Sequence, residues 1–282
     1  MKFSLILCTL NRPKELDSCV NSILNQTYDN FEIIIIDQSD EENKKYIKFH
    51  DKVKYFHTND RGLSHCRNLA LSYVCGDYCC LMDDDAEFKS NTLFEIQRII
   101  KLHKCDVVSG LIVDKNTNEK WMKTMGDKDC FVSFNNVFGC SSASLTIKTS
   151  ILKKYRFDER LGAGNRWGCG EETDLLLRIM YDGYLIYYSP NIIIYHPKEQ
   201  IADANLNKIY KYNLGYGAYF CKHIKIYNNK KMFFSLMYAI FKNIVAVILY
   251  LFTNKKRKYY IICIKGKVVG YFEFRKMVKK NV

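Results

Sequence analysis

The sequence is poor in proline and glycine, with 3 Pro and 14 Gly among 282 residues. Collagen-like chains need glycine at every third position and mucin-like stalks need many prolines, so both classes are excluded. The apolar share of 48% is enough to bury a core, which argues against disorder. The length suits one large domain, or one domain with an appendage.

Several common binding signatures are also missing. The chain has 12 cysteines but no CxxC pair, and the cluster Cys75, Cys79 and Cys80 lacks zinc-site spacing. It contains no GxGxxG or GKS/T loop, which disfavours a standard dinucleotide or P-loop site. The apolar run 3–9 has no small-residue cleavage site, so we interpret it as a first strand and not a signal peptide. Without an export signal, twelve cysteines indicate reduced thiols in a cytoplasm.

Acidic residues are almost absent from the end of the chain. Residues 201–282 carry 17 Lys and Arg but only Asp203 and Glu273 as acids, whereas residues 1–200 are nearly neutral. The overall charge of +13 therefore belongs to the tail. We predict a domain at 1–200, followed by a basic, helical, membrane-associating segment at 201–282.

The tail also holds the longest apolar run, the 21 residues 232–252, interrupted by Lys242. At about 1.5 Å per residue this run could cross a bilayer core of roughly 30 Å. Lys242 and basic clusters on both sides count against a span. The clusters are Lys222, Lys225, Lys230 and Lys231 before the run, and Lys255, Lys256, Arg257 and Lys258 after it.

We therefore expect a helix or hairpin that lies in the plane of the membrane's cytoplasmic surface. Anionic lipids would attract both basic clusters there. A single span and a buried core helix with a solvated basic rim are the alternatives. Basic charge alone also attracts nucleic acid, but no nucleic-acid module accompanies it, so we expect no such partner.

Strand and helix signals alternate over the first 110 residues. Apolar runs at 3–9, 31–36, 53–57 and 78–82 predict strands, and helical spacing occurs at 13–24, 63–74 and 92–103. Such alternation predicts a parallel sheet with helices on both faces. Ligands bind at the carboxyl ends of strands in these sheets, where Thr9, Asp37 and Asp83 fall. Further strands are expected at 138–147, 184–188 and 192–195, and a loop at 157–174.

Three consecutive carboxylates, Asp83, Asp84 and Asp85, follow the fourth apolar run. They would repel one another unless solvated or neutralised, and hard divalent cations prefer carboxylate oxygens. A solvated acidic turn that caps the next helix is the alternative. Asp37 could accept hydrogen bonds from the N–H of a nucleotide base or from a ribose hydroxyl, or it could form an Asx turn.

Other charged residues lie at predicted helix starts and strand ends. Arg67 lies near the start of a predicted helix, a setting that suits a phosphate as well as a surface salt bridge. Glu171, Glu172 and Asp174 open another helix, where they either complement the helix dipole or supply a general base. His196 ends a strand and could bind metal or phosphate, although a lone histidine is more often structural.

Taken in order, these pieces resemble family 2 of the glycosyltransferases, which has the GT-A fold. The resemblance spans about residues 3–197 through the stretches ILCTLNRPKEL, FEIIIIDQSD, RGLSHCRNLAL, GDYCCLMDDDAEF and FDERLGAGNRWGCGEETDLLLRIMYDGY, followed by YHP. It implies an α/β, Rossmann-like mixed sheet flanked by helices. It also implies metal-dependent, inverting transfer of a sugar from a nucleotide-diphosphate sugar to a glycan or lipid-linked acceptor in bacterial polysaccharide synthesis.

The resemblance further implies residue roles. The donor site would be lined by Thr9, Arg12, Asp37, Arg67, Asp83 and Asp84. Asp83 and Asp85 match the Asp-x-Asp pair that holds Mg²⁺ or Mn²⁺, and His196 matches a histidine near that metal. Glu172 matches the usual catalytic acidic residue, with Asp174 close by. The family commonly has Glu-Asp where this chain has Glu171-Glu172, so either glutamate could be the base.

Two other classes remain open at this point. A sugar nucleotidyltransferase would also use an α/β sheet and acidic metal ligands, but it would need neither an acceptor-side base nor the basic tail. A non-catalytic membrane- or carbohydrate-binding module would tolerate loss of the acidic cluster.

Overall fold

The computed structural model describes residues 1–43, 45, 50–120, 125–197 and 205–280. They divide into two compact units. The first comprises Met1–Arg61, His65–Phe157 and residues 175–197, and the second Gly62–Ser64, Asp158–Asp174 and residues 205–280. The boundary expected between residues 200 and 201 lies outside the described residues, and the division into 1–200 and 201–282 stays a prediction.

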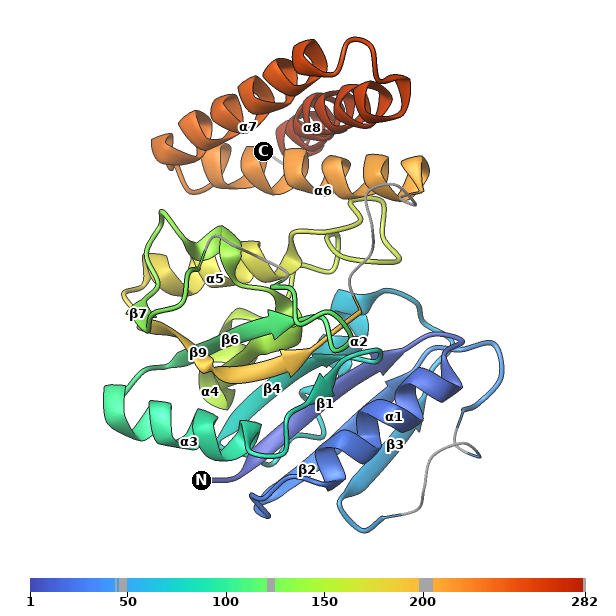
Figure 1. The fold of residues 1–282 in the computed structure, drawn as a ribbon, viewed down its shortest axis with the longest axis vertical. Helices are drawn as coiled ribbons and strands as arrows, with labels where there is room; N and C mark the ends of the chain where they lie inside the picture. Colours follow the sequence, from blue (N-terminus) through green and yellow to red (C-terminus); the bar gives the residue numbers. More distant parts are fainter. Residues whose placement is uncertain (44, 46–49, 121–124, 198–204, 281–282) are drawn as a thin grey trace. The chain divides into compact units, whose positions relative to one another are not determined.

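The first unit is built on a nine-stranded mixed sheet (Figure 1). Its parallel part has the order β3-β2-β1-β4, with β1 (Phe3–Thr9), β2 (Phe31–Asp37), β3 (Val53–His57) and β4 (Tyr78–Asp83). The order continues through β8 (Leu145–Lys148), β6 (Val107–Val113), β9 (Ile186–Tyr195) and β5 (Glu87–Phe88), while β7 (Cys130–Phe131) pairs with β9. β8 runs antiparallel to both β4 and β6, and this makes the sheet mixed.

The central strands are apolar because helices cover both faces of the sheet. Every residue of β1 and of β2 is buried. On one face, Leu5 and Ile33 share a core with the apolar stripes of α1 (Pro13–Leu24) and α3 (Thr92–His103). Residues 65–70 of α2 (Leu63–Ala70) and α4 (Thr149–Tyr155) lie on the opposite face (Figure 1).

The expected α/β fold is confirmed, and three details of the prediction are wrong. Segment 138–147 is not one strand, because two 3-10 turns, Val137–Gly139 and Ser142–Ser144, precede β8. The helix expected at 63–74 ends at Ala70. The two last strands are one strand, β9, whose register with β6 shifts between Gly110 and Leu111. This shift leaves Pro190, which has no N–H to donate, outside the ladder.

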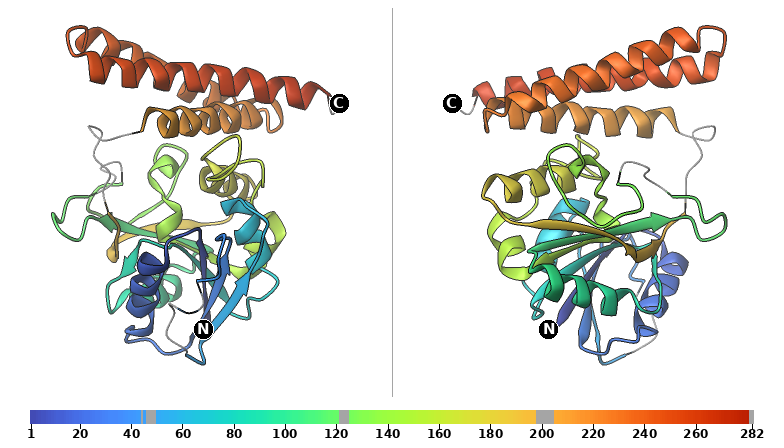
Figure 2. Two further views of the ribbon diagram at one scale, coloured as in Figure 1. Left: turned by 90° about the vertical axis from the view of Figure 1, so that its right-hand side faces the viewer. Right: turned by 60° about the vertical axis from the view of Figure 1, so that its left-hand side comes forward.

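The second unit contains three long helices, α6 (Leu206–Lys225), α7 (Lys230–Leu249) and α8 (Asn254–Lys280). α6 and α8 pack most extensively, and α7 packs against both (Figure 2). Glycines allow the close approach of α6 and α8, because a Cβ at Gly270 would overlap the carbonyl oxygen of Leu214. The unit also holds the acidic start of α5 (Glu171–Tyr181), whose remaining residues belong to the first unit.

Candidate active site

The carboxyl ends of three parallel strands bring predicted site residues to one edge of the sheet. Thr9 at the end of β1 pairs with Asp37 at the end of β2, and Cys8 pairs with Asp83 at the end of β4. Asp84 and Asp85 follow in the turn after β4. The edge is therefore acidic, and its chemistry depends on how these carboxylates are neutralised.

Asp84 points into the protein. It accepts a hydrogen bond from Thr9 Oγ1 at 2.7 Å, and Arg12 Nη1 lies 3.1 Å from its Oδ1. The same Arg12 nitrogen lies 2.8 Å from Asp85 Oδ2. Burial raises the pKa of Asp84 to about 6, although the hydrogen bond from Thr9 and the charge of Arg12 act in the opposite direction.

Asp83 and Asp85 form ion pairs with two further side chains, those of Arg67 and His196. Arg67, which is 1% exposed, donates from Nη2 to Asp83 Oδ1 at 3.0 Å. It lies in the last turn of α2 and not near the helix start, where the sequence placed it. His196 Nε2 lies 3.1 Å from Asp85 Oδ1 and 3.7 Å from Asp83 Oδ2. Burial disfavours the imidazolium, but these two carboxylates outweigh it and raise the pKa of His196 to about 10.

The donor atoms at this edge suit a divalent cation that is shared with phosphate. Within the described ranges, no group of three or more His, Cys, Asp or Glu side chains is arranged to hold a metal by itself. Mg²⁺, however, commonly takes only one or two carboxylates and completes its shell with waters and substrate phosphates. Asp83 and Asp85 supply such oxygens, and His196 Nδ1 donates to the Pro197 carbonyl at 2.9 Å, which directs Nε2 toward them.

Asp37 is fully buried and saturated by neighbouring donors. It accepts hydrogen bonds from the backbone N–H groups of Ser39 at 2.9 Å and Asn43 at 2.8 Å, and from the Tyr55 hydroxyl. The bond from Ser39 forms the Asx turn considered as an alternative. Burial and the hydrogen bond with Asp37 raise the pKa of Tyr55 well above its usual value. Asp37 thus organises the loop after β2.

The three acids at the start of α5 differ in exposure. Glu171 is 5% exposed, and Gly162, with φ +99°, allows the preceding loop to approach its carboxylate. Asp174 is fully buried beneath the side chains of Lys222 and His223 of α6. Glu172 is half-buried and is the least buried residue of the three, although its Oε2 atom is buried.

Sequence reasoning missed part of the second unit's polar structure. Lys222 was grouped with the basic cluster ahead of the apolar run, but it is 5% exposed and pairs with Asp158 and Asp174. The neighbouring His223 is fully buried. The one signal available is that Lys222 and His223 directly follow Phe220 and Cys221, in an apolar part of α6.

The expected apolar helix is present as α7. Among the described helices, α7 alone is long and apolar enough to cross a membrane. Its most apolar stretch of 18 residues has a mean hydropathy of 2.0, and 11% of that stretch is buried. Only Met232 and Leu236 are buried in it. Its exposed large apolar side chains are Phe233, Phe234, Met237, Tyr238, Phe241, Ile244, Val245, Ile248 and Leu249.

The mixed sheet with its acidic carboxyl edge defines the first unit as a GT-A-type domain. The family described as "Glycosyl transferase family 2" matches residues 4–158, which is more than half of the chain. The chain therefore belongs to glycosyl transferase family 2, as its motifs predicted.

Individual relatives also match only part of the chain. An uncharacterized glycosyltransferase of Rickettsia bellii is 38% identical over 96 residues, which cover 33% of this chain and 14% of that protein. The GalNAc(5)-diNAcBac-PP-undecaprenol beta-1,3-glucosyltransferase of Campylobacter jejuni is 26% identical over 170 residues, covering 56% of this chain and 55% of that protein. The chain thus spans at most about half the length of these two relatives.

Solved structures confirm the fold. The crystal structure of S. aureus TarS 1-349 in complex with UDP-GlcNAc superposes with a TM-score of 0.59 at 15% sequence identity, covering 98% of this chain and 92% of that one. The complex of the same protein with UDP has the same TM-score and covers 100% of this chain. At this level of identity, the likeness concerns the fold alone.

Proposed function

We propose that this chain is a metal-dependent, inverting glycosyltransferase. It transfers a sugar from a nucleotide-diphosphate sugar to a hydroxyl of a glycan or lipid-linked acceptor in polysaccharide synthesis. The observation that carries the proposal is the acidic cluster of Asp83, Asp84 and Asp85 at the carboxyl edge of the parallel strands. Family membership supports it, as do the undecaprenol-linked acceptor in the name of the C. jejuni relative and the UDP-GlcNAc bound to TarS.

On the donor side, Asp83, Asp85 and His196 would hold Mg²⁺ or Mn²⁺, and His196 would release the proton that the two carboxylates favour when the cation is absent. The bound cation would supply positive charge to the leaving diphosphate. Arg12 is 49% exposed in its side chain, so its guanidinium can exchange a carboxylate for a phosphate oxygen. Thr9 holds Asp84 in its inward position. Asp37 and Arg67 are buried and would shape the donor pocket from within.

On the acceptor side, a carboxylate takes the proton of the attacking hydroxyl. The new bond forms between the acceptor oxygen and the anomeric carbon as the bond to the diphosphate breaks on the opposite face, which inverts the configuration. We assign this proton transfer to Glu172, because it matches the family's usual catalytic acidic residue and because the residue as a whole is less buried than Glu171. Glu171 is enclosed by the backbone near Gly162.

We propose that α7 attaches the enzyme to the cytoplasmic face of the membrane. Its exposed apolar residues form a large surface that water does not favour, and such surfaces mark membrane or protein contacts. The basic residues Lys255, Lys256, Arg257 and Lys258 at the start of α8 suit anionic lipid. α7 packs along α6 and α8, so it can lie in the membrane surface without leaving these helices.

The decisive experiment measures release of nucleoside diphosphate from a panel of nucleotide sugars, with glycan and lipid-linked acceptors. Chelation is expected to abolish transfer, and Mg²⁺ or Mn²⁺ to restore it. Asp85→Asn should fold normally but lose metal-dependent donor binding. Full transfer in excess chelator would refute metal dependence. Pyrophosphate formation from a nucleoside triphosphate and a sugar phosphate would instead establish a nucleotidyltransferase.

Matched glutamate variants test the base. Glu172→Gln should lower turnover on the order of 10² to 10⁴-fold with donor affinity kept, the usual share of general-base catalysis. Glu171→Gln is the control and should retain most of the turnover. The opposite pattern would assign the general base to Glu171. Wild-type turnover in both variants would show that the general base lies outside this turn.

A further inference from the structure

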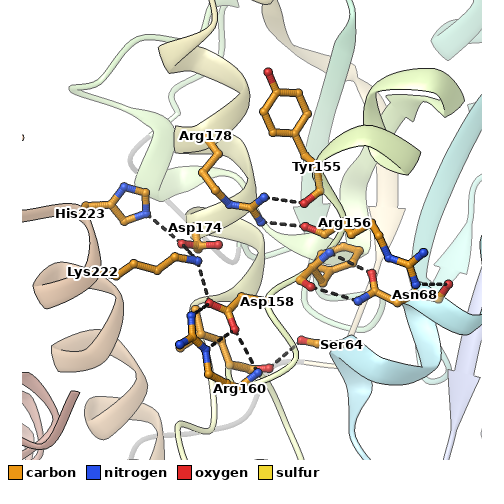
Figure 3. A network of polar contacts seen from close by, with 12 residues as sticks. Ser64, Asn68, Tyr155, Arg156, Asp158, Arg160, Asp174, Arg178, Lys222 and His223 are labelled. Carbon is orange, nitrogen blue, oxygen red and sulfur yellow. Dashed lines mark hydrogen bonds and ion pairs between the residues drawn. The ribbon is translucent and has the colours of Figure 1, made fainter. Parts of the chain in front are cut away.

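A buried charge network in the second unit joins the two ends of the segment Asp158–Asp174. Lys222 Nζ of α6 lies 2.7 Å from Asp158 Oδ2 and 2.7 Å from Asp174 Oδ1 (Figure 3). His223, the next residue of α6, places Nε2 3.0 Å from the same Asp174 oxygen. One lysine therefore contacts the first and the last residue of this segment.

The network is enclosed and its charges are matched. The side chains of Asp174 and His223 are 0% exposed, and that of Lys222 is 7% exposed. Arg160 also donates two hydrogen bonds to Asp158, from Nε to Oδ1 at 2.8 Å and from Nη2 to Oδ2 at 2.6 Å. Although burial opposes ionisation, Arg160 and Lys222 lower the pKa of Asp158 to about 2. Because removing one partner leaves a buried charge unpaired, the loss of any one of these charges should strongly destabilise the closed geometry.

The segment between the two aspartates carries the acidic start of α5. The backbone N–H of Asp174 donates to the Gly170 carbonyl at 2.9 Å, so Glu171 and Glu172 lie in the helical turn that Asp174 anchors. Earlier in the segment, Trp167 is 7% exposed and packs against Phe274 of α8 with ring centroids 5.1 Å apart. A change at Asp158 or Asp174 would therefore alter the surroundings of Trp167 and the positions of both glutamates.

We propose that Lys222 is a positioning residue: it clamps the two ends of the 158–174 loop and so holds Glu172 in place for proton transfer. The clamp follows from the contacts alone, whereas its catalytic consequence rests on the proposed function. Asp174, which the sequence offered as a third candidate base, acts through this clamp, since its side chain is sealed from any substrate.

Trp167 gives a test that does not depend on activity. The chain has two tryptophans, so Trp121→Phe leaves Trp167 as the single tryptophan. In that background Lys222→Met, nearly isosteric but uncharged, should raise acrylamide quenching of Trp167 several-fold and shift its emission to the red. Lys222→Arg should restore most of the protection. Lys225→Met, on the exposed face of the same helix, is the control and should change neither signal.

The kinetic test separates positioning from general stability. Displacing a catalytic group by about 1 Å can cost on the order of 10²-fold in rate, so Lys222→Met should lower kcat by roughly 10- to 100-fold. KM for the donor should stay within about twofold, because the donor residues belong to the first unit. If Lys222→Met does not fold by circular dichroism, Asp174→Asn provides the same comparison with shape retained and charge removed.

The outcomes are distinct. Unchanged quenching in a folded Lys222→Met or Asp174→Asn protein overturns the clamp. An exposed Trp167 with wild-type kcat overturns the positioning role. Exposure of Trp167 in the variant, together with no nucleoside diphosphate release by the wild-type protein from any donor, would uphold the clamp and refute the proposed function instead. Exposure with a lowered kcat, both rescued by Lys222→Arg, supports the whole inference.

Discussion

The strength of the proposed membrane contact can be worked out from the exposed apolar side chains of α7. Phe234, Phe241 and Ile248 are 69%, 60% and 59% exposed, and their spacing of seven residues places them on one face of the helix. Full burial of such a side chain contributes about 1.5 to 3 kcal/mol. Scaled by their exposed fractions, the three together contribute roughly 3 to 6 kcal/mol. Replacing all three with serine should therefore weaken membrane partitioning by about 10² to 10⁴-fold.

Co-sedimentation with vesicles that contain about one-third phosphatidylserine measures this, at about 0.1 M and about 1 M salt. The wild-type chain should stay largely bound at high salt, because apolar burial is not screened. The control variant, Lys255→Glu with Lys256→Glu and Lys258→Glu, should bind more weakly, with less dependence on salt. Equal binding of the serine variant and the wild type would refute the assignment of this face to lipid. So would a wild-type chain that stays in the supernatant at low salt.

Two further predictions concern stability. Burial opposes ionisation of Glu32, yet hydrogen bonds from Lys54 and other donors lower its pKa to about 2. Glu32→Gln should therefore cost about 2 to 3 kcal/mol near neutral pH, and urea unfolding should show this cost shrinking as the pH falls below about 4.5 and vanishing near 2. Gly270→Ala should destabilise the protein by about 1 to 3 kcal/mol through overlap with Leu214, despite alanine's better helix propensity. Val268→Ala, at an exposed position of α8, is the thermal-melting control.

Strands β1, β2 and β4 could be predicted because they are buried on both faces. Runs such as Phe3–Thr9 and Phe31–Asp37 are apolar at nearly every position, and this pattern fits a central parallel strand and little else. Segment 137–144 could not be predicted in the same way. Its serines and alanine are compatible with strand or turn, and the antiparallel insertion of β8 between β4 and β6 depends on partners distant in sequence.

In the tail, the sequence likewise could not predict which basic residues are exposed. Its apolar run predicted a helix, and α7 confirms that helix at Lys230–Leu249. The sequence could not show that some of its basic residues turn inward. Lys267 is 9% exposed and bonds to Asn213 of α6, and burial lowers its pKa. Lys222 likewise depends on Asp158 and Asp174. A basic segment therefore does not have a uniformly basic surface, because a lysine that is buried against a partner cannot contact lipid headgroups.

The acidic edge shows how three identical neighbours come to differ. The side chains of Asp83 and Asp85 are 28% and 22% exposed and converge on His196, whereas that of Asp84 is 10% exposed and is held by Thr9. Asp83 ends β4 and the other two residues form the turn after it, in which Asp83 and Asp85 reach the edge and Asp84 turns inward. The pKa values follow this division: that of Asp84 rises to about 6 through burial. That of Asp85 is lowered, since its ion pairs outweigh its burial. The spacing of two, more than the count of acids, is why we assign Asp83 and Asp85 to the cation and Asp84 to the protein's own framework.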